Sequence, residues 1–199
     1  KWIIRSMIRI GILGDIGSGK SFVAKNFGHP VFNADMEVSK LYKNDRKTFY
    51  RLKKKLPKYF PSFPIDKNQV SYAIMDNQSN LKKIISIVHL EIRKKMNSFL
   101  AKNKNKKIVI LDIPLLLENK INKRKDILIF VQSKKSDVMK RLKKRKNFNQ
   151  NLFIKFKKIQ LPLNYKRKRS HFIINNDFTK KTVVKYVKNI LNKVNKWKK

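Results

Sequence analysis

The sequence predicts an α/β fold in three layers, with an open parallel sheet of about five strands and helices on both of its faces. Two observations support this prediction. Short apolar segments of the kind that parallel sheets bury alternate along the chain with segments of helical periodicity. A glycine-rich segment, residues 14–21, stands between the first such strand and the first such helix. Because ligands of these sheets bind beyond the carboxyl ends of the strands, a site is expected at that edge.

Apolar segments are expected to form the strands, and they are residues 8–13, 31–34, 108–112, 127–131 and 172–174. Helices are expected at residues 20–27, 36–56, 67–76, 79–102, 136–146, 149–159 and 180–196. In the longest of these helices and in the last, apolar side chains recur every three or four residues, which is typical of a helix with one buried face. Prolines at 57, 61 and 64 break the helical pattern and indicate a loop.

The chain has 199 residues, a length that suits one domain with insertions. Residues 1–35, 103–135 and 170–199 contain the predicted strands and are expected to form the core. The helices of 36–102 form one expected insertion. Residues 136–169 form another, which we interpret as a mobile lid that closes over bound phosphates and excludes water.

The charge of the chain is strongly basic, with 51 lysines and arginines against 12 aspartates and glutamates, a formal net charge of +39. Such a balance can indicate a nucleic-acid-binding protein. The charges are, however, spread along the whole chain, and asparagine and isoleucine are abundant as well, so a compositional bias is the favoured interpretation. No specific nucleic-acid partner is therefore expected, although the surface should attract polyanions nonspecifically at low salt.

The composition also bears on the compartment. The chain has no cysteine, which excludes disulfides and thiolate metal sites and fits a cytoplasmic protein. It has no run of about 18 apolar residues, so no membrane span is expected. The basic and apolar residues 1–12 lead directly into the glycine-rich segment, so we interpret them as part of the fold rather than as a signal peptide.

The glycine-rich segment, Gly14-Asp15-Ile16-Gly17-Ser18-Gly19-Lys20-Ser21, fits the pattern G-x-x-x-x-G-K-[ST] of phosphate-binding loops. Glycines let the backbone curl so that N–H groups converge on phosphate oxygens. Lys20 can reach the β- and γ-phosphates of a nucleotide, and the Ser21 hydroxyl can bind Mg²⁺. The alternative is a chance match in a turn, which the flanking strand and helix disfavour.

Two aspartates follow predicted strands at the same edge of the sheet. Asp35 could accept a proton from an attacking hydroxyl, and an N-cap for the following helix is an equally good interpretation. Asp112 ends the strand Ile-Val-Ile-Leu and resembles the carboxylate that holds Mg²⁺ in phosphoryl-transfer enzymes; the alternative is a turn residue. Glu118 follows soon after and is either functional or a solvated residue early in a helix.

Arginine is rare in this chain, yet Arg141 and Arg145 lie four residues apart on one face of a predicted helix. The planar guanidinium suits bidentate phosphate contacts, and a solvated basic face is the alternative. His89 lies on a helix that otherwise faces the core, where a single histidine is usually structural. No spacing of histidine, aspartate and glutamate indicates a metal site made by the protein alone.

Together these residues resemble the dephospho-CoA kinase family over nearly the whole chain. The matching segments are the phosphate-binding loop, Asn33-Ala34-Asp35, Leu41-Tyr42, residues 89–96, residues 111–119, Arg141-Leu142-x-x-Arg145, Gln160-x-Pro162 with Lys166, and Asn175. The segment 111–119 is the most specific to the family.

The resemblance implies ATP-dependent phosphorylation of the ribose 3′-hydroxyl of dephospho-CoA, with Mg²⁺ as cofactor and with ATP and dephospho-CoA as the small-molecule partners of an expected monomer. Asp35 would be the general base. Lys20 and the loop would hold the ATP phosphates, and Arg141 would close on them as a further catalytic group. Arg145 and Asn175 would add contacts to ATP.

The resemblance also implies an acceptor site in the helical region 36–102 and beside the segment after the third strand. The residues that would bind dephospho-CoA there are Asp35, His89, Arg93, Leu115 and Glu118. Ser21 and Asp112 would hold Mg²⁺.

Several positions depart from the family pattern. Asp15 stands in place of a glycine, Asn33 in place of an aspartate, Leu90 in place of a proline, and Ser170-His171 in place of Ala-Asp. None of these changes removes the expected base, lysine or Mg²⁺ ligand. Another small-molecule kinase, such as a nucleoside monophosphate kinase, is the nearest alternative. A basic nucleic-acid-binding protein with a secondary nucleotide site is the alternative from another class.

Overall fold

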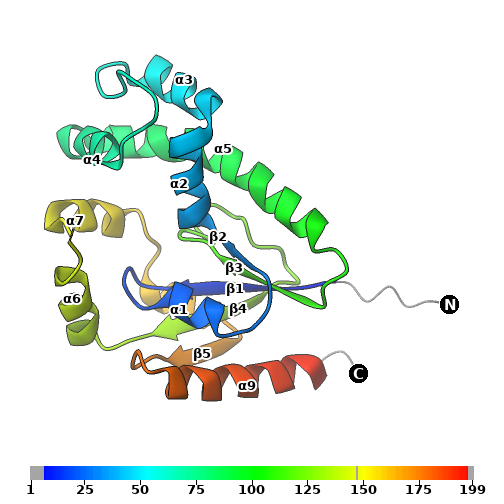
Figure 1. Ribbon diagram of the computed structural model, residues 1–199. Helices are drawn as coiled ribbons and strands as arrows, with labels where there is room; N and C mark the ends of the chain where they lie inside the picture. Colours follow the sequence, from blue (N-terminus) through cyan, green and yellow to red (C-terminus); the bar gives the residue numbers. More distant parts are fainter. Residues whose placement is uncertain (1–6, 147, 197–199) are drawn as a thin grey trace. The chain divides into compact units, whose positions relative to one another are not determined.

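The sheet is the centre of the fold, and all of its strand pairs are parallel, in the order β2-β3-β1-β4-β5 (Figure 1). The computed structural model describes residues 7–146 and 148–196. The strands are β1 Ile8–Gly14, β2 Val31–Asn33, β3 Ile108–Asp112, β4 Ile127–Gln132 and β5 Phe172–Asn175. The strand segments expected from the sequence are thus confirmed, and so is the parallel α/β fold.

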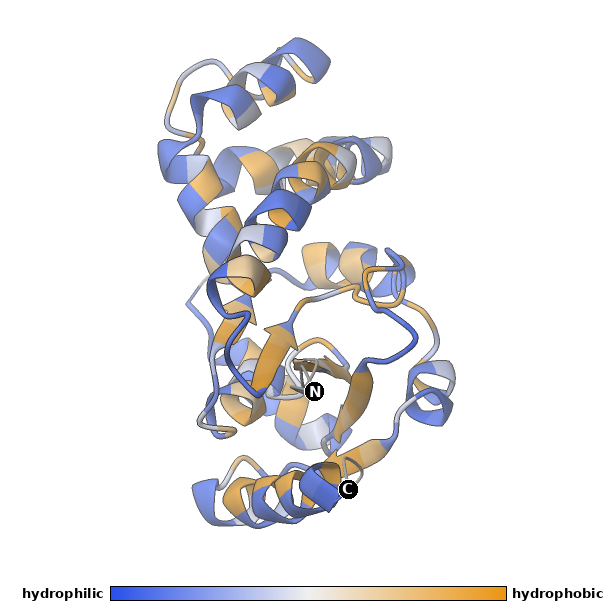
Figure 2. Ribbon diagram, turned by 90° about the vertical axis from the view of Figure 1, so that its right-hand side faces the viewer, coloured by the Kyte–Doolittle hydropathy of each residue, from blue (hydrophilic) through white to orange (hydrophobic). Residues whose placement is uncertain are grey.

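The core explains why the strands are almost purely apolar. β1 and β3 are buried at every residue, and the strands are hydrophobic over most of their length (Figure 2). Helix α1, Lys20–Lys25, and helix α9, Lys180–Lys196, contribute buried side chains to the same cluster. Each buried Ile, Val or Leu contributes about 1.5–3 kcal/mol, so the short strands are held by packing rather than by their length.

The chain divides into two compact units. The sheet unit contains the residues up to Asn33, residues 103–148 and the residues from Gln160 onward, and the helical unit contains residues 34–102 and 149–159. Of the predicted lid 136–169, only 149–159 therefore groups with the helical unit.

The helical unit consists of α2 Ala34–Asn44, α3 Arg46–Lys55, α4 Lys67–Asp76, α5 Gln78–Lys102 and α7 Gln150–Lys158. The expectation of one helix over 36–56 is wrong. The Asp45 side chain accepts a hydrogen bond of 3.0 Å from the N–H of Lys47, so it caps α3 and separates it from α2. The expected helix 67–76 is confirmed, and it begins with a capping box of Asp66 and Gln69.

The contacts of one lysine and the burial of one tyrosine show how the helical unit is held together. Lys155 of α7 donates hydrogen bonds of 3.1 and 3.2 Å to the carbonyl groups of Ile74 and Met75 near the end of α4, where a cation is favoured. Tyr42 of α2 is buried, and this burial raises the pKa of its hydroxyl to about 12. Tyr42 is therefore a neutral core residue at ordinary pH.

The sheet unit contains two further helices, α6 Lys135–Lys143 and α8 Leu163–Lys168. α8 is not among the expected helices, because its only strong signal is Pro162 at the N-cap. Among the described residues, no helix combines the length and the apolar character needed to cross a membrane.

Candidate active site

The phosphate-binding loop lies between β1 and α1, as expected. The Lys20 ammonium donates hydrogen bonds to the carbonyl oxygens of Asp15, at 2.7 Å, and Gly14, at 3.4 Å. The Asp15 carboxylate, which departs from the family pattern, accepts a hydrogen bond of 2.7 Å from the N–H of Ile16. Asp15 thus has a local role in shaping the loop, which its sequence position did not explain.

The loop is supported by two residues that the sequence prediction missed. The carbonyl oxygen of Ser18 accepts hydrogen bonds from Ser133 Oγ, at 2.9 Å, and from Asn176 Nδ2, at 2.8 Å. Asn176 is only 3% exposed, and its Oδ1 also accepts the N–H of Phe178 at 2.9 Å. The signal that could have found both residues is their position just after β4 and β5, at the carboxyl edge of the sheet.

Asn175, the residue predicted to contact ATP, is exposed, and its amide donates to the Tyr186 hydroxyl at 3.2 Å. The loop that follows β5 is ordered by Asp177. Its carboxylate accepts hydrogen bonds from the N–H of Thr179 and the hydroxyls of Thr179 and Thr182. These donors, the Thr179 N–H foremost, lower the pKa of Asp177 below its usual value.

Arg141 and Arg145 do not lie on one helix face, so that part of the prediction is wrong. α6 ends at Lys143, which leaves Arg145 beyond the helix. Continuing the helix through the basic residues 143–146 would set like charges one turn apart, which is unfavourable. The exposed Arg141 guanidinium lies 4.3 Å from the ring centroid of Phe178, a cation–π contact with the loop that also supports the phosphate-binding loop through Asn176.

The expected Mg²⁺ ligands Ser21 and Asp112 lie close together, with Asn33 between them. Asn33 Nδ2 is 2.6 Å from Asp112 Oδ2 and 3.4 Å from Ser21 Oγ. The Ser21 hydroxyl oxygen and the Asp112 carboxylate oxygens are ligands of the type that Mg²⁺ prefers. Among the described residues, no group of three or more His, Cys, Asp or Glu side chains could hold a metal. A cation here would need phosphate oxygens as further ligands, which is how Mg²⁺ is usually bound beside nucleotides.

Glu118 is neither helical nor solvated, contrary to one interpretation of the sequence. It lies in a turn, and its side chain is 10% exposed. Its Oε1 forms an ion pair of 2.6 Å with Lys166, which is 3% exposed, and accepts the N–H of Leu161 at 3.0 Å. Leu115, at the start of the same turn, has a left-handed backbone with φ of 57°. The segment predicted to bind the acceptor is therefore fixed from inside the sheet unit.

Asp35 belongs to the helical unit, where it is exposed in the first turn of α2. The expected strand ends earlier, at Asn33, so Asp35 is not at its end. His89 is half-buried and Arg93 is exposed, both on α5.

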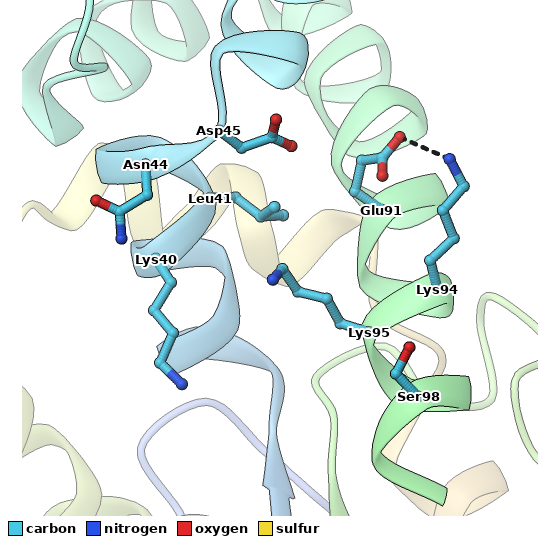
Figure 3. A pocket seen from close by; sticks show the side chains of 8 residues that line it. All are labelled: Lys40, Leu41, Asn44, Asp45, Glu91, Lys94, Lys95 and Ser98. Atoms are coloured by element: carbon cyan, nitrogen blue, oxygen red, sulfur yellow. Dashed lines mark hydrogen bonds and ion pairs between the residues drawn. The ribbon is translucent and has the colours of Figure 1, made fainter. Parts of the chain in front are cut away.

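A cavity of about 380 Å³ opens within the helical unit between α2 and α5 (Figure 3). Its lining consists of Lys40, Leu41, Asn44, Asp45, Glu91, Lys94, Lys95 and Ser98. His89 and Arg93 are not part of this lining. Glu91 carries the negative charge on the α5 side and pairs with Lys94 at 3.0 Å and with Arg51 at 2.7 Å. The carboxylates balance most of the lysines, so the cavity is polar rather than strongly cationic.

Gly19 offers a direct test of the loop. Its φ is 88°, and an added Cβ would clash with Asn176 Nδ2, so Gly19→Ala should strain the backbone and displace Asn176. Strain of about 1–3 kcal/mol should weaken ATP binding about tenfold or more in isothermal titration. Gly28→Ala is the matched control, since φ there is 66° but no described atom lies within 4 Å of a Cβ. Equal ATP affinities of the two variants would contradict the assignment of the loop.

Comparison with known proteins agrees with the geometry. A model of the dephospho-CoA kinase family matches residues 8–182. The dephospho-CoA kinase of Wolbachia sp. subsp. Brugia malayi is 35% identical over 187 residues, which cover 92% of this chain and 95% of that protein. A crystal structure of a Thermus thermophilus protein superposes with a TM-score of 0.76 at 26% identity, over 94% of this chain and 98% of the other.

A dephospho-CoA kinase from Campylobacter jejuni has the same fold, with a TM-score of 0.60 at 18% identity over 94% of this chain and 96% of that chain. The family match spans both units, and it includes the phosphate-binding loop, Asp35, Asp112 and Glu118. The chain therefore belongs to the dephospho-CoA kinase family.

Proposed function

We propose that this chain transfers the γ-phosphoryl group of ATP to the ribose 3′-hydroxyl of dephospho-CoA, with the residues described above in defined roles. The observation that carries the proposal is the gathering of Lys20, Ser21 and Asp112 at the carboxyl edge of the sheet, in a chain that belongs to the family. The reaction forms a bond between the 3′-oxygen and the γ-phosphorus. It breaks the bond from that phosphorus to the oxygen shared with the β-phosphate, and CoA and ADP result.

The phosphate groups are bound by the sheet unit in this proposal. The loop N–H groups and the Lys20 ammonium hold the β- and γ-phosphates. The Lys20 ammonium donates hydrogen bonds to the carbonyl oxygens of Gly14 and Asp15 in the loop. In this proposal it exchanges these acceptors for phosphate oxygens when ATP binds. The exposed Arg141 guanidinium is held by its cation–π contact with the Phe178 ring. It supplies further positive charge where negative charge develops in the transition state. Arg145 and Asn175 have no described contact with the loop, so their roles as ATP ligands rest on the family resemblance.

The cofactor in this proposal is Mg²⁺. Ser21 Oγ and the Asp112 carboxylate would hold it together with oxygens of ATP. When bound, the cation would neutralise part of the charge on the transferring phosphoryl group. The protein contributes two oxygen ligands that are already oriented by Asn33.

The acceptor would bind through the helical unit. Asp35 accepts the proton of the 3′-hydroxyl as the 3′-oxygen attacks. His89 and Arg93 of α5 and the turn that contains Leu115 and Glu118 are the remaining candidates for acceptor contacts. The buried ion pair of Glu118 favours a role in holding that turn. Residues 136–169 would act as the lid, with α7 of the helical unit as its central part.

We expect the protein to act as a monomer in the cytoplasm. The lack of cysteine fits the cytoplasmic compartment. A coupled assay of ADP release with ATP, Mg²⁺ and dephospho-CoA tests the proposed function. Turnover with dephospho-CoA but not with AMP or free nucleosides is expected, and Lys20→Ala is the inactive control. Turnover with a nucleoside monophosphate but none with dephospho-CoA would overturn the proposal in favour of another small-molecule kinase.

A further inference from the structure

We infer that Asn33 is a positioning residue for Asp112 and Ser21, and that its neutral amide makes Mg²⁺ binding depend on the nucleotide. The inference rests on the proposed function, because it takes Ser21 and Asp112 as the Mg²⁺ ligands. It goes beyond that function in assigning a role to a residue at which the chain departs from the family pattern.

The placement of Asn33 follows from the sheet. β2 and β3 are parallel neighbours, and their register sets Asn33 opposite Asp112. Both residues end their strands, so both side chains emerge at the carboxyl edge, where α1 begins with Lys20 and Ser21. One amide nitrogen reaches both oxygens, at 2.6 Å from Asp112 Oδ2 and 3.4 Å from Ser21 Oγ. Strand pairing therefore brings the three side chains together.

The burial of Asp112 makes this contact important. Asp112 is 3% exposed, and a buried carboxylate is costly unless it accepts hydrogen bonds. Within residues 7–146 and 148–196, Asn33 is the side chain that donates to it. The hydrogen bond from Asn33 satisfies Oδ2 and fixes its direction. Asn33 thus holds the Asp112 carboxylate in one orientation.

The identity of residue 33 also sets the charge of the site. With asparagine, the Asp112–Asn33 pair carries one negative charge. An aspartate at 33 would place a second carboxylate at hydrogen-bonding distance from the first, and such a pair repels until a cation or a proton relieves it. A site with two carboxylates can attract a divalent cation by itself, since affinity rises with the number of charged ligands. With a single carboxylate, the phosphate oxygens of ATP must supply the further negative charge. We therefore expect Mg²⁺ to bind together with ATP.

The test compares divalent-cation binding with and without nucleotide. Mn²⁺, a paramagnetic substitute for Mg²⁺, is titrated into the full chain and its free concentration is followed by electron paramagnetic resonance. Wild-type protein should bind Mn²⁺ weakly alone and at least about tenfold more tightly with a non-hydrolysable ATP analogue. Asn33→Asp should bind Mn²⁺ alone about 10–100-fold more tightly than wild type.

A control and a second variant separate the effect of the charge at residue 33 from its role in positioning Asp112 and Ser21. Asn192→Asp adds the same charge on the exposed side of α9 and should leave Mn²⁺ binding unchanged. Asn33→Ala removes the hydrogen bond and adds no charge. It should weaken Mn²⁺ binding in the presence of the analogue about tenfold while leaving metal-free binding of the analogue unchanged. Circular dichroism establishes that each variant is folded.

The results distinguish this inference from the proposed function. If Asn33→Asp binds Mn²⁺ alone no more tightly than Asn192→Asp does, the role of the neutral amide is refuted. If Asn33→Ala leaves the Mn²⁺ affinity of the ternary complex unchanged, the positioning role is refuted. If wild-type protein lacks any nucleotide-dependent Mn²⁺ site, the assignment of Ser21 and Asp112 in the proposed function fails first.

Discussion

An Asp35→Asn variant should fold, bind ATP with normal affinity and lose about 10²–10⁴-fold in kcat with dephospho-CoA. The amide has nearly the same size as the carboxylate but cannot accept the proton of the attacking hydroxyl. Asp35 is exposed in the first turn of α2, and the loss of its charge at a helix N-terminus should cost about 0.3–1 kcal/mol of folding stability. Its effect should therefore appear in turnover and not in stability.

The measurement is a steady-state assay of ADP release, accompanied by isothermal titration of ATP. Glu37→Gln is the matched control, since it removes a carboxylate from the same first turn. Glu37 pairs with Lys40 at 2.6 Å and is not placed at the reacting atoms, so this variant should keep near-normal kcat. Near-normal kcat in Asp35→Asn would remove Asp35 from the role of base. An equal loss in both variants would indicate a general effect of charge in this helix turn.

Replacing Lys166 with methionine should lower the free energy of unfolding by about 3–5 kcal/mol, because Glu118 would be left buried without its cation. Lys166 is 3% exposed and its ammonium lies 2.6 Å from the Glu118 carboxylate, whose other oxygen, Oε2, is buried and lacks a partner among the described residues. A carboxylate with one unsatisfied oxygen depends strongly on the cation at the other. This makes the substitution more costly than the loss of an ordinary surface ion pair.

Urea unfolding of the sheet unit within the full chain measures this effect. Lys168→Met, an exposed position of the same helix, should change the free energy of unfolding by less than about 0.5 kcal/mol. The double variant Glu118→Gln with Lys166→Met should recover much of the loss, since the uncompensated charge is gone. A small effect of Lys166→Met alone would show that water reaches Glu118 and that the turn is not held by this pair.

The sheet and the phosphate-binding loop were predictable because their signals are local. Continuous apolar segments identify buried parallel strands, and the loop pattern fixes the positions of Lys20 and Ser21 within a few residues. Asp112 could be placed at the carboxyl edge because it directly ends such a segment. The role of Asp35 came from the resemblance to the family, since its position alone left an N-cap equally possible.

The features that were missed depend on contacts between distant segments. The position of Asn176 after β5 is a local sign of the sheet edge, but its contact with Ser18 depends on β5 lying beside β4 in the sheet, which the sequence does not show locally. The ATP contact of Asn175 stays a prediction from the resemblance, and the neighbouring Asn176 is the residue that contacts the loop. The pairing of Glu118 with Lys166 likewise joins segments far apart in the chain. The break at Asp45 had a local cause, since capping overrode a helical pattern that apolar spacing alone would have continued.

The point at which the chain passes from the sheet unit into the helical unit limits how far Asp35 can lie from Asn33. β2 ends at Asn33 and α2 begins at Ala34, so no linker separates the last residue of one unit from the first of the other. Asp35 is two residues past that junction, and consecutive Cα atoms are about 3.8 Å apart. The Cα atom of Asp35, the proposed base, therefore lies within about 8 Å of that of Asn33, the residue that contacts Asp112 and Ser21, because only one residue separates them in the chain.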